Sequence, residues 1–322
     1  MKASRSIRFS TIFCWVLALA FVISPQVLQA QWNALVGAQS GDKGKQALAF
    51  LPNEIWIHAG DDITWTFAVD EIHTVTFLTA GQTRPSRQQG CPGFSAGSAV
   101  FDGSTCVTTS SLTAGETFKV TFPTTGNYKL VCLVHANMTG VVHVLSLSTP
   151  LPHDQRFYDH QAQIEGNDLL SEAEHAGHHG AEAVVAGAGE VVANAGGSQT
   201  VSLMRFDEPM KTIHVGDTVE WTNQDPVTPH TITFGTEPAN PRPPSGNVTV
   251  DADGARHAVI NSAADNVHSG FIVAAPQDRI GLAQAPLGVT RFRVTFTHAG
   301  VYDYICALHD DLGMKGKINV RP

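Results

Sequence analysis

The chain has 322 residues, of which 43% are hydrophobic and 15% are charged, and its mean hydropathy is −0.02. This balance is typical of a folded, water-soluble protein and excludes a disordered chain or a polytopic membrane protein. The formal net charge of −9 argues against nucleic acid or an anionic membrane as the partner, because both require clustered positive charge.

The first 30 residues predict a secretory signal peptide. A basic start precedes an apolar stretch from Ile12 to Ile23, and Ala30 ends a short segment suited to cleavage. About 12 apolar residues are too few for a spanning helix, which needs about 20. We therefore expect an exported protein, periplasmic or extracellular, with no membrane span in the mature chain.

Four cysteines remain after this leader, namely Cys91, Cys106, Cys132 and Cys306. Cysteines tend to pair in an oxidising compartment, and Cys91 and Cys106 close a loop rich in Gly and Ser. This pair predicts a disulfide. Cys132 and Cys306 lie far apart in apolar, strand-like segments, and each precedes a histidine by three residues. They call for another role.

A repeat divides the chain into two β domains, expected at residues 31–148 and 198–322. The segment Asn53–Trp65 recurs as Pro209–Trp221, and a His-Thr-x-Thr-Phe motif follows each copy. An alternating Phe-x-Val-x-Phe strand and a Gly-x-Tyr pair then stand at matched distances before a cysteine in both copies. Alternating strands with one apolar row pack as β-sandwiches. The sequence thus predicts an all-β protein with two sandwiches.

Residues 149–197 are predicted to be an acidic, partly helical linker. Tyr158 to Glu174 carries a weak apolar stripe that indicates a helix, while the Ala- and Gly-rich tail up to Gly197 is expected to be mobile. The linker also contains His153, His160, His175, His178 and His179. Such a tract can either bind a metal ion or be a solvent-exposed segment without a specific role.

Each domain ends in the same potential metal site. The two sets of candidate ligands are His73, Cys132, His135 and Met138, and His230, Cys306, His309 and Met314. A thiolate, two imidazoles and a thioether are the ligands of a trigonal His2Cys copper site with a weak axial Met. A Cys-x-x-His motif alone is ambiguous, but the added methionine, the upstream histidine and the duplication favour two copper ions.

On these residues both halves resemble cupredoxins, the blue copper proteins, over about 45–147 and 199–320. The second Cys-x2-His-x4-Met loop is similar to that of plastocyanin, and the first, Cys-x2-His-x2-Met, resembles the amicyanin type. The resemblance implies Greek-key sandwiches, each with one mononuclear type 1 copper, that shuttle electrons to redox protein partners such as a cytochrome, a reductase or an oxidase. It also implies that the loop histidine lies nearest the surface, where apolar neighbours such as Leu133 and Leu312 would dock a partner.

The sequence departs from plastocyanin in two respects. Thr74 and Thr231 follow the first histidine ligand where plastocyanin has an asparagine, so the hydrogen bonding and potential of the sites do not carry over. The separation from histidine to cysteine is also longer, with the excess in Gly81–Ser111 and Pro238–Ala285. These insertions are expected to cap a face or dock a partner.

Two other functions stay open besides an exported, non-enzymatic electron carrier. Two-domain laccases and copper nitrite reductases add a catalytic copper site to cupredoxin domains, but this chain has no His-x-His pair, and Val131 and Ile305 stand directly before the ligand cysteines. Interface histidines of an oligomer could still build such a site, the candidates being His143, His257, His268 and His298. Copper storage or delivery rests only on the linker histidines. The oligomeric state and the direction of electron flow are undetermined.

Overall fold

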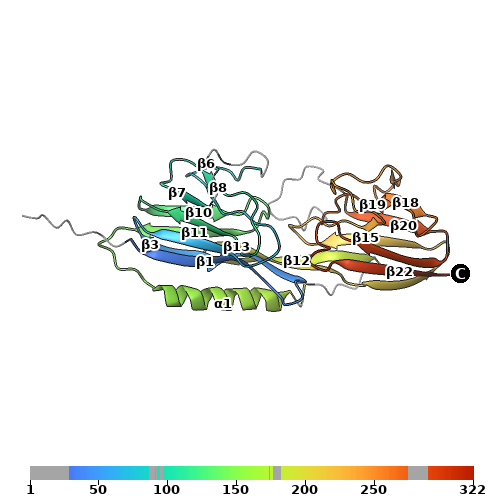
Figure 1. The fold of residues 1–322 in the computed structure, drawn as a ribbon, viewed down its shortest axis with the longest axis horizontal. Coiled ribbons are helices and arrows are strands. Elements are labelled where there is room, and N and C mark those ends of the chain that lie inside the picture. The colour runs from blue at the N-terminus through green and yellow to red at the C-terminus, as the bar shows by residue number, and fades with distance from the viewer. Residues whose placement is uncertain are drawn as a thin grey trace, which may run out of the picture.

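The computed structural model describes residues 29–86, 91, 93–94, 97–173, 175–176, 183–274 and 289–322. Residues 1–28 of the predicted signal peptide, together with His178 and His179, lie outside these ranges. The described residues form strands and one helix, α1 (Gln155–Glu172), as Figure 1 shows.

The strands of the first half are β1 (Gln31–Gln39), β2 (Lys45–Leu51), β3 (Glu54–His58), β4 (Asp62–Phe67), β5 (Thr76–Phe77), β6 (Gly93–Phe94), β7 (Ser98–Val100), β8 (Val107–Thr108), β9 (Thr117–Thr121), β10 (Gly126–Val131) and β11 (Thr139–Leu145). Those of the second half are β12 (Val184–Asn194), β13 (Gly197–Phe206), β14 (Met210–His214), β15 (Thr218–Gln224), β16 (Thr233–Phe234), β17 (Thr249–Val250), β18 (Arg256–Ile260), β19 (Val267–His268), β20 (Arg291–Phe296), β21 (Gly300–Ile305) and β22 (Lys315–Arg321).

Each half is a sandwich whose core lies between two layers of strands. In the first half the order β3-β11-β10-β5-β8-β6 faces β2-β1-β4-β9-β7, and in the second β14-β22-β21-β16-β19 faces β17-β18-β20-β15-β12-β13. The alternation in β9 buries Phe118 and Val120 and turns Lys119 outward. Trp65 and Trp221 are fully buried at the centres of the two cores. The predicted all-β architecture with two sandwiches is confirmed.

The two sandwiches share one continuous sheet of 11 strands. Strands β2 and β13 pair antiparallel, with Leu48 opposite Thr200 and Ala47 opposite Val201. Figure 1 shows β12 and β13 running across the junction between the two halves. Backbone hydrogen bonds, rather than a flexible tether, therefore join the domains.

The Ala- and Gly-rich tail of the predicted linker differs from the expectation of a mobile segment, because Val184–Asn194 forms β12. This strand lies between β15 and β13 in the middle of the sheet, and Val184 to Ala186 are buried. Because the first half of β12, Val184–Ala188, is buried, it lacks the polar alternation that marks an edge or half-exposed strand. The domain boundaries themselves stay predictions, and this pairing favours a start of the second domain near Val184.

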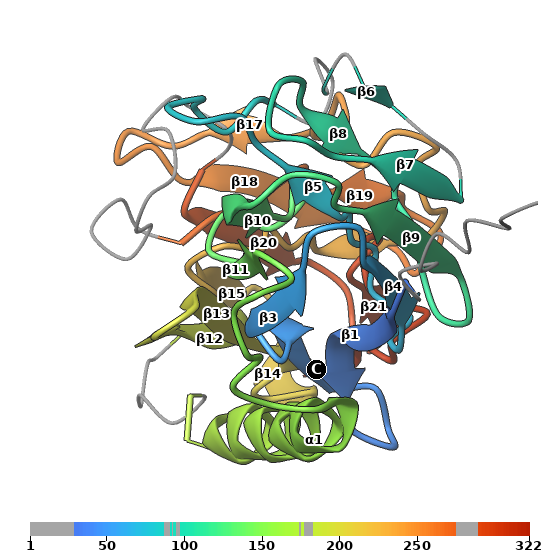
Figure 2. The same ribbon diagram turned by 90° about the vertical axis from the view of Figure 1, so that its left-hand side faces the viewer.

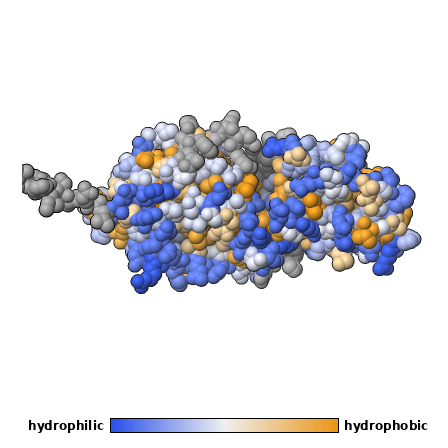
Figure 3. Space-filling view, in the orientation of Figure 1, coloured by the Kyte–Doolittle hydropathy of each residue, from blue (hydrophilic) through white to orange (hydrophobic). Residues whose placement is uncertain are grey.

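Helix α1 confirms the predicted helix and covers the junction sheet. It begins after Asp154, whose carboxylate accepts a hydrogen bond from the Phe157 N–H and thereby caps the free amides of the first turn. Ala162 and Leu169 pack against Ala47, Ala49 and Leu51 of β2. Figure 2 shows the helix on one outer face of the molecule, and in Figure 3 its exposed side is mainly hydrophilic.

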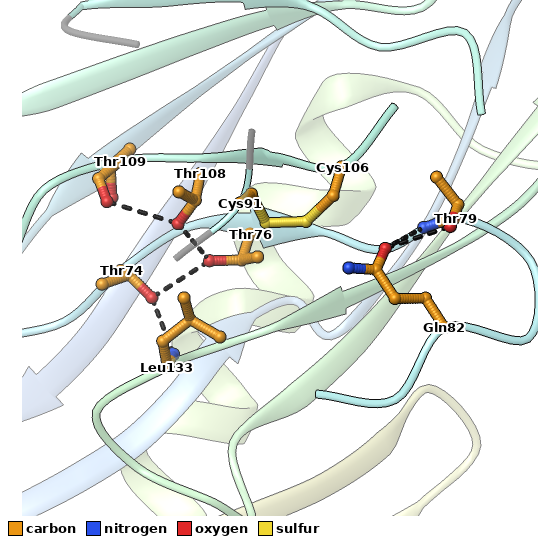
Figure 4. Close-up of a disulfide and its surroundings, with 9 residues drawn as sticks. All are labelled: Thr74, Thr76, Thr79, Gln82, Cys91, Cys106, Thr108, Thr109 and Leu133. Atoms are coloured by element: carbon orange, nitrogen blue, oxygen red, sulfur yellow. Dashed lines mark hydrogen bonds between the residues drawn. A yellow bond between two sulfur atoms is a disulfide. The ribbon is translucent and has the colours of Figure 1, made fainter. Parts of the chain in front are cut away.

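Cys91 and Cys106 form the predicted disulfide in the insertion of the first domain (Figure 4). The bridge lies in a small apolar cluster with Leu78, Val131 and Leu133, so it ties the insertion to the end of β10. No helix in the described ranges is long and apolar enough to cross a membrane.

Replacing both Cys91 and Cys106 by alanine should lower the free energy of unfolding by about 3 kcal/mol, because a closed loop of this length restricts the unfolded chain by about that amount. Denaturant titration of the mature protein measures this difference. Thiol labelling of denatured, unreduced, metal-free protein should find only the two free thiols of Cys132 and Cys306. Labelling of four thiols would contradict the bridge.

Candidate metal centres

The first predicted ligand set is assembled at one end of the first sandwich. His73 precedes β5, Cys132 directly follows β10, and His135 and Met138 lie in the turn that leads into β11. The Cys132 Sγ lies 3.9 Å from the Nδ1 of both His73 and His135, and the two Nδ1 atoms are 3.1 Å apart. All four residues are buried. His73, which lies 59 residues before Cys132, thus shares one buried place with the three loop residues.

The second set repeats this arrangement. The Cys306 Sγ lies 3.8 Å from the His230 Nδ1 and 3.4 Å from the His309 Nδ1, and these nitrogens are 3.1 Å apart. Met314 is fully buried in the same core as Cys306. Its carbonyl accepts the Cys306 N–H, as the carbonyl of Met138 does for Cys132. The backbone closes both loops in the same way.

Both donor sets fit a bound metal ion. Metal–nitrogen and metal–sulfur bonds are about 2.0 and 2.3 Å long. Donors bound to one ion therefore lie about as far apart as the histidine nitrogens and the cysteine sulfur do in each set. In the described part of the chain, only His73, Cys132 and His135, and His230, Cys306 and His309, form groups of three or more potential ligands. Their thiolate and imidazole donors suit copper.

The histidines favour the thiolate form of each cysteine. Burial alone would raise the pKa of the Cys132 thiol, but hydrogen bonds with His135 and His73 hold it well below its ordinary value. Burial opposes ionisation of Cys306 as well, and the charges and hydrogen bonds of His309 and His230 lower its pKa. The thiolate is the form that binds a metal.

Threonines take the place of the asparagine expected in plastocyanin. The Thr74 N–H points at the Cys132 Sγ at 3.4 Å, and the Thr231 N–H points at the Cys306 Sγ at 3.3 Å. The Thr74 Oγ1 also accepts the Leu133 N–H at 2.7 Å. Such contacts fix the sulfur and influence the potential of a bound copper.

The hydrogen-bond chains behind these threonines differ between the domains. From Thr74 the chain runs through Thr76 to Thr108 beside the disulfide (Figure 4). In the second domain it runs from Thr231 through Thr233 to the Nδ1 of His268. His268 therefore has a place in the surroundings of the second site and not among its donors.

The remaining histidines considered for catalysis lie elsewhere. His143 contacts Glu54 and Asn127, and His257 contacts Asp251 and Thr295. His298 hydrogen-bonds Thr297. Within the described ranges none of them belongs to a group of three potential ligands.

The loop histidines are the most exposed ligands of their sets, as expected, but they are still buried. His135 and His309 are only 2% and 3% exposed, because the two metal loops face each other across a cleft of about 780 Å³ between the domains. Leu133 and Leu312 also line this cleft. The apolar surroundings of the histidines are therefore part of the junction between the two domains.

Two functional residues escaped the sequence analysis. Glu71 lies between the two loop histidines, 3.3 Å from the His135 Nε2 and 3.7 Å from the His309 Nε2. Burial alone would raise the pKa of Glu71, but its hydrogen bond to His135 and the nearby histidine charges lower it to about 2. Gly187 of β12, at φ +80°, touches the ring of His230. A sequence signal existed only for the glycine, since Val-Gly-Ala at Gly37 parallels Ala-Gly-Ala at Gly187.

The fold and the two donor sets define a tandem cupredoxin with copper as its cofactor. The chain belongs to the plastocyanin/azurin family, since the family described as "Copper binding proteins, plastocyanin/azurin family" matches residues 37–145 and 190–321. A plastocyanin from Synechococcus sp. (strain JA-2-3B'a(2-13)) is 29% identical over 124 residues, which are 38% of this chain and 68% of that protein.

Solved structures that resemble part of the chain include plastocyanins and amicyanins. The oxidised plastocyanin of Dryopteris crassirhizoma is 21% identical and aligns over 37% of this chain and 89% of its own, with a TM-score of 0.21. A reduced amicyanin mutant is 21% identical and aligns over 45% of this chain and 89% of its own, with a TM-score of 0.23.

Proposed function

We propose that the protein is an exported electron carrier with two type 1 copper sites. The observation that supports this function most directly is the pair of buried donor sets, one in each domain. We assign one copper to His73, Cys132, His135 and Met138, and the other to His230, Cys306, His309 and Met314. The redox partner is proposed to be another protein.

Copper, when bound, supplies a one-electron change between its two oxidation states. The protein holds thiolate and thioether sulfurs that stabilise Cu(I) and imidazoles that suit both states. Each cysteine directly follows a strand of a packed sandwich and each loop histidine lies in the turn that follows, while the Thr74 and Thr231 amides restrain the sulfurs. A site that cannot rearrange favours rapid transfer of the electron over chemistry on a substrate.

A catalytic role finds less support. Laccase-like or nitrite reductase-like chemistry requires a further copper site, and in the described ranges His143, His257, His268 and His298 do not converge. For storage or delivery, His153 stacks on Phe157 with ring centroids 3.6 Å apart, which gives this linker histidine a structural contact. The proposal therefore stays with electron transfer.

Replacing Cys132 by serine should remove the first blue site and leave the second, because a hydroxyl cannot supply the thiolate on which such a site depends. The mature variant is expected to keep about half of the blue absorption and one tightly bound copper. Visible absorption with metal analysis measures both. Cys306→Ser is the matched variant for the other site. Two equivalents of blue copper in either variant would refute the ligand assignment.

A further inference from the structure

The two proposed copper sites share one carboxylate. Glu71 lies between β4 and β5 of the first domain and is 7% exposed. One of its oxygens lies 3.3 Å from the His135 Nε2, and the other lies 3.7 Å from the His309 Nε2. The side chain therefore contacts a loop histidine of each domain at the same time.

The orientation of the two rings makes this contact a link between the sites. Each loop histidine turns its Nδ1 toward the cysteine of its own site, at 3.9 Å in the first and 3.4 Å in the second. The Nε2 atoms are then left to face Glu71. A carboxylate on the outer nitrogen of a histidine ligand commonly orients that ligand, and here a single carboxylate contacts two such histidines.

Strand β13 holds the two metal loops at a fixed spacing. Thr200 donates a hydrogen bond to the Asn137 carbonyl in the first loop, at 3.4 Å. Arg205 donates to the Leu312 carbonyl in the second loop at 2.7 Å and to the Asp42 carbonyl of the first domain at 2.6 Å. The strand pairs with β2 in the same region. Contact between the two loops is thus built into the shared sheet.

The second domain has no counterpart of Glu71. Thr228 occupies the matching position, two residues before the first histidine ligand. The nearby Asp225 accepts the N–H groups of Val227 and Thr228, and its other oxygen is 3.9 Å from the His230 Nε2. Among the described residues, Glu71 is the one carboxylate in contact with both loop histidines.

We propose that Glu71 bridges the two copper sites for electron transfer, so that an electron passes between the domains inside one molecule. The inference rests on the proposed function. One site is oxidised as the other is reduced, and this one-electron exchange needs no further reactant. Glu71 acts through His135 and His309 and is therefore a positioning residue. The path crosses two contacts and one carboxylate between the imidazole rings.

Pulse radiolysis of the copper-loaded mature protein tests this bridge. All proteins carry Met314→Gln, because a changed axial ligand shifts the potential of the second site and makes redistribution between the sites visible. A pulse that reduces few molecules should give a second phase whose rate is independent of protein concentration. We expect this phase to vanish in Cys306→Ser and to slow by about tenfold in Glu71→Leu, where the polar contacts of the carboxylate with both imidazoles are lost.

Two further variants isolate the role of the bridge. Glu71→Gln keeps the shape of the side chain and should slow the phase less than Glu71→Leu does. Asp70→Asn removes the neighbouring charge, which contacts Gln39 and Lys43 and not the loop histidines, and should leave the rate unchanged. Pulsed dipolar EPR of the oxidised proteins should find the same spacing between the coppers in all variants. If Glu71→Leu alters that spacing, the rate of the second phase in Glu71→Gln is used in its place to test the bridge.

Three results would overturn the inference. If the reference protein, which carries Met314→Gln alone, shows no concentration-independent phase, the two sites act separately. If both Glu71 variants retain both blue sites and show the same rate as the reference protein, the electron takes a path that does not include Glu71. If the protein without any substitution binds fewer than two blue coppers, the proposed function fails first, and the bridge fails with it.

Discussion

Gly187→Ala should abolish the second blue site while the first remains. An added Cβ at this position would overlap the ring of His230, and the backbone there has φ +80°. The left-handed backbone costs about 1–2 kcal/mol in a residue other than glycine, and overpacking adds about 1–3 kcal/mol. The histidine can escape the overlap only by leaving its place beside Cys306. Visible absorption and copper content should both fall by about half.

Gly216→Ala is the control for the backbone alone. This glycine has φ +94°, but nothing lies within 4 Å of an added Cβ. The Gly216→Ala variant should have a free energy of unfolding that is lower only by the cost of the left-handed backbone, and it should keep both blue sites. If Gly187→Ala binds two equivalents of blue copper, close packing against His230 is not required to build the second site.

Val201→Asp should uncouple the two domains. Val201 is fully buried in β13 and lies opposite Ala47 of β2, where the sheets merge. A carboxylate at this position has no partner and should cost about 3–5 kcal/mol. Scanning calorimetry of the wild-type protein is expected to show one cooperative transition, because the sheet is continuous. The variant should show two separate transitions or unfold at a much lower temperature.

Val301→Asp provides the matched control on an exposed strand. Val301 in β21 is 51% exposed, so the same substitution there should change the free energy of unfolding by less than about 0.5 kcal/mol. A single unchanged transition in Val201→Asp would show that the junction does not depend on this part of the sheet.

The sandwiches and the donor sets could be predicted because the sequence records them twice. Each ligand type has a physical reason, and the pattern repeats at matched offsets, since Phe118 and Phe292 each lie 14 residues before the ligand cysteine of their half. The helix was predictable from its apolar stripe. Strand β12 was not, because a central strand covered on both faces shows small apolar residues without alternation.

Glu71 and the burial of the loop histidines could not be predicted for a different reason. Both depend on how the domains pack, and the repeat describes each domain alone. A single glutamate without a counterpart, with Thr228 at the matching place, is indistinguishable from a surface acid. The resemblance places the loop histidine nearest the surface, and here that surface is the cleft shared with the other domain.

The pairing of β2 with β13 also implies a symmetry. Gln46 and Ser202 are separated along the chain by as many residues as Trp65 and Trp221, so they are equivalent in the two halves. They lie opposite each other in the antiparallel pair, as the two copies of one residue do on the axis of an isologous dimer. The chain is therefore a covalent pseudo-dimer with a local twofold axis between these strands.

A twofold axis makes two sites equal only where the residues around them are equal. Glu71 contacts both loop histidines, but it belongs to one half alone, and its position in the other half is Thr228. The hydrogen-bond chains behind the cysteines end differently as well, at Thr108 and at His268. The symmetry brings the sites together, and its local breaking gives them different surroundings, which is the condition for a preferred direction of electron flow.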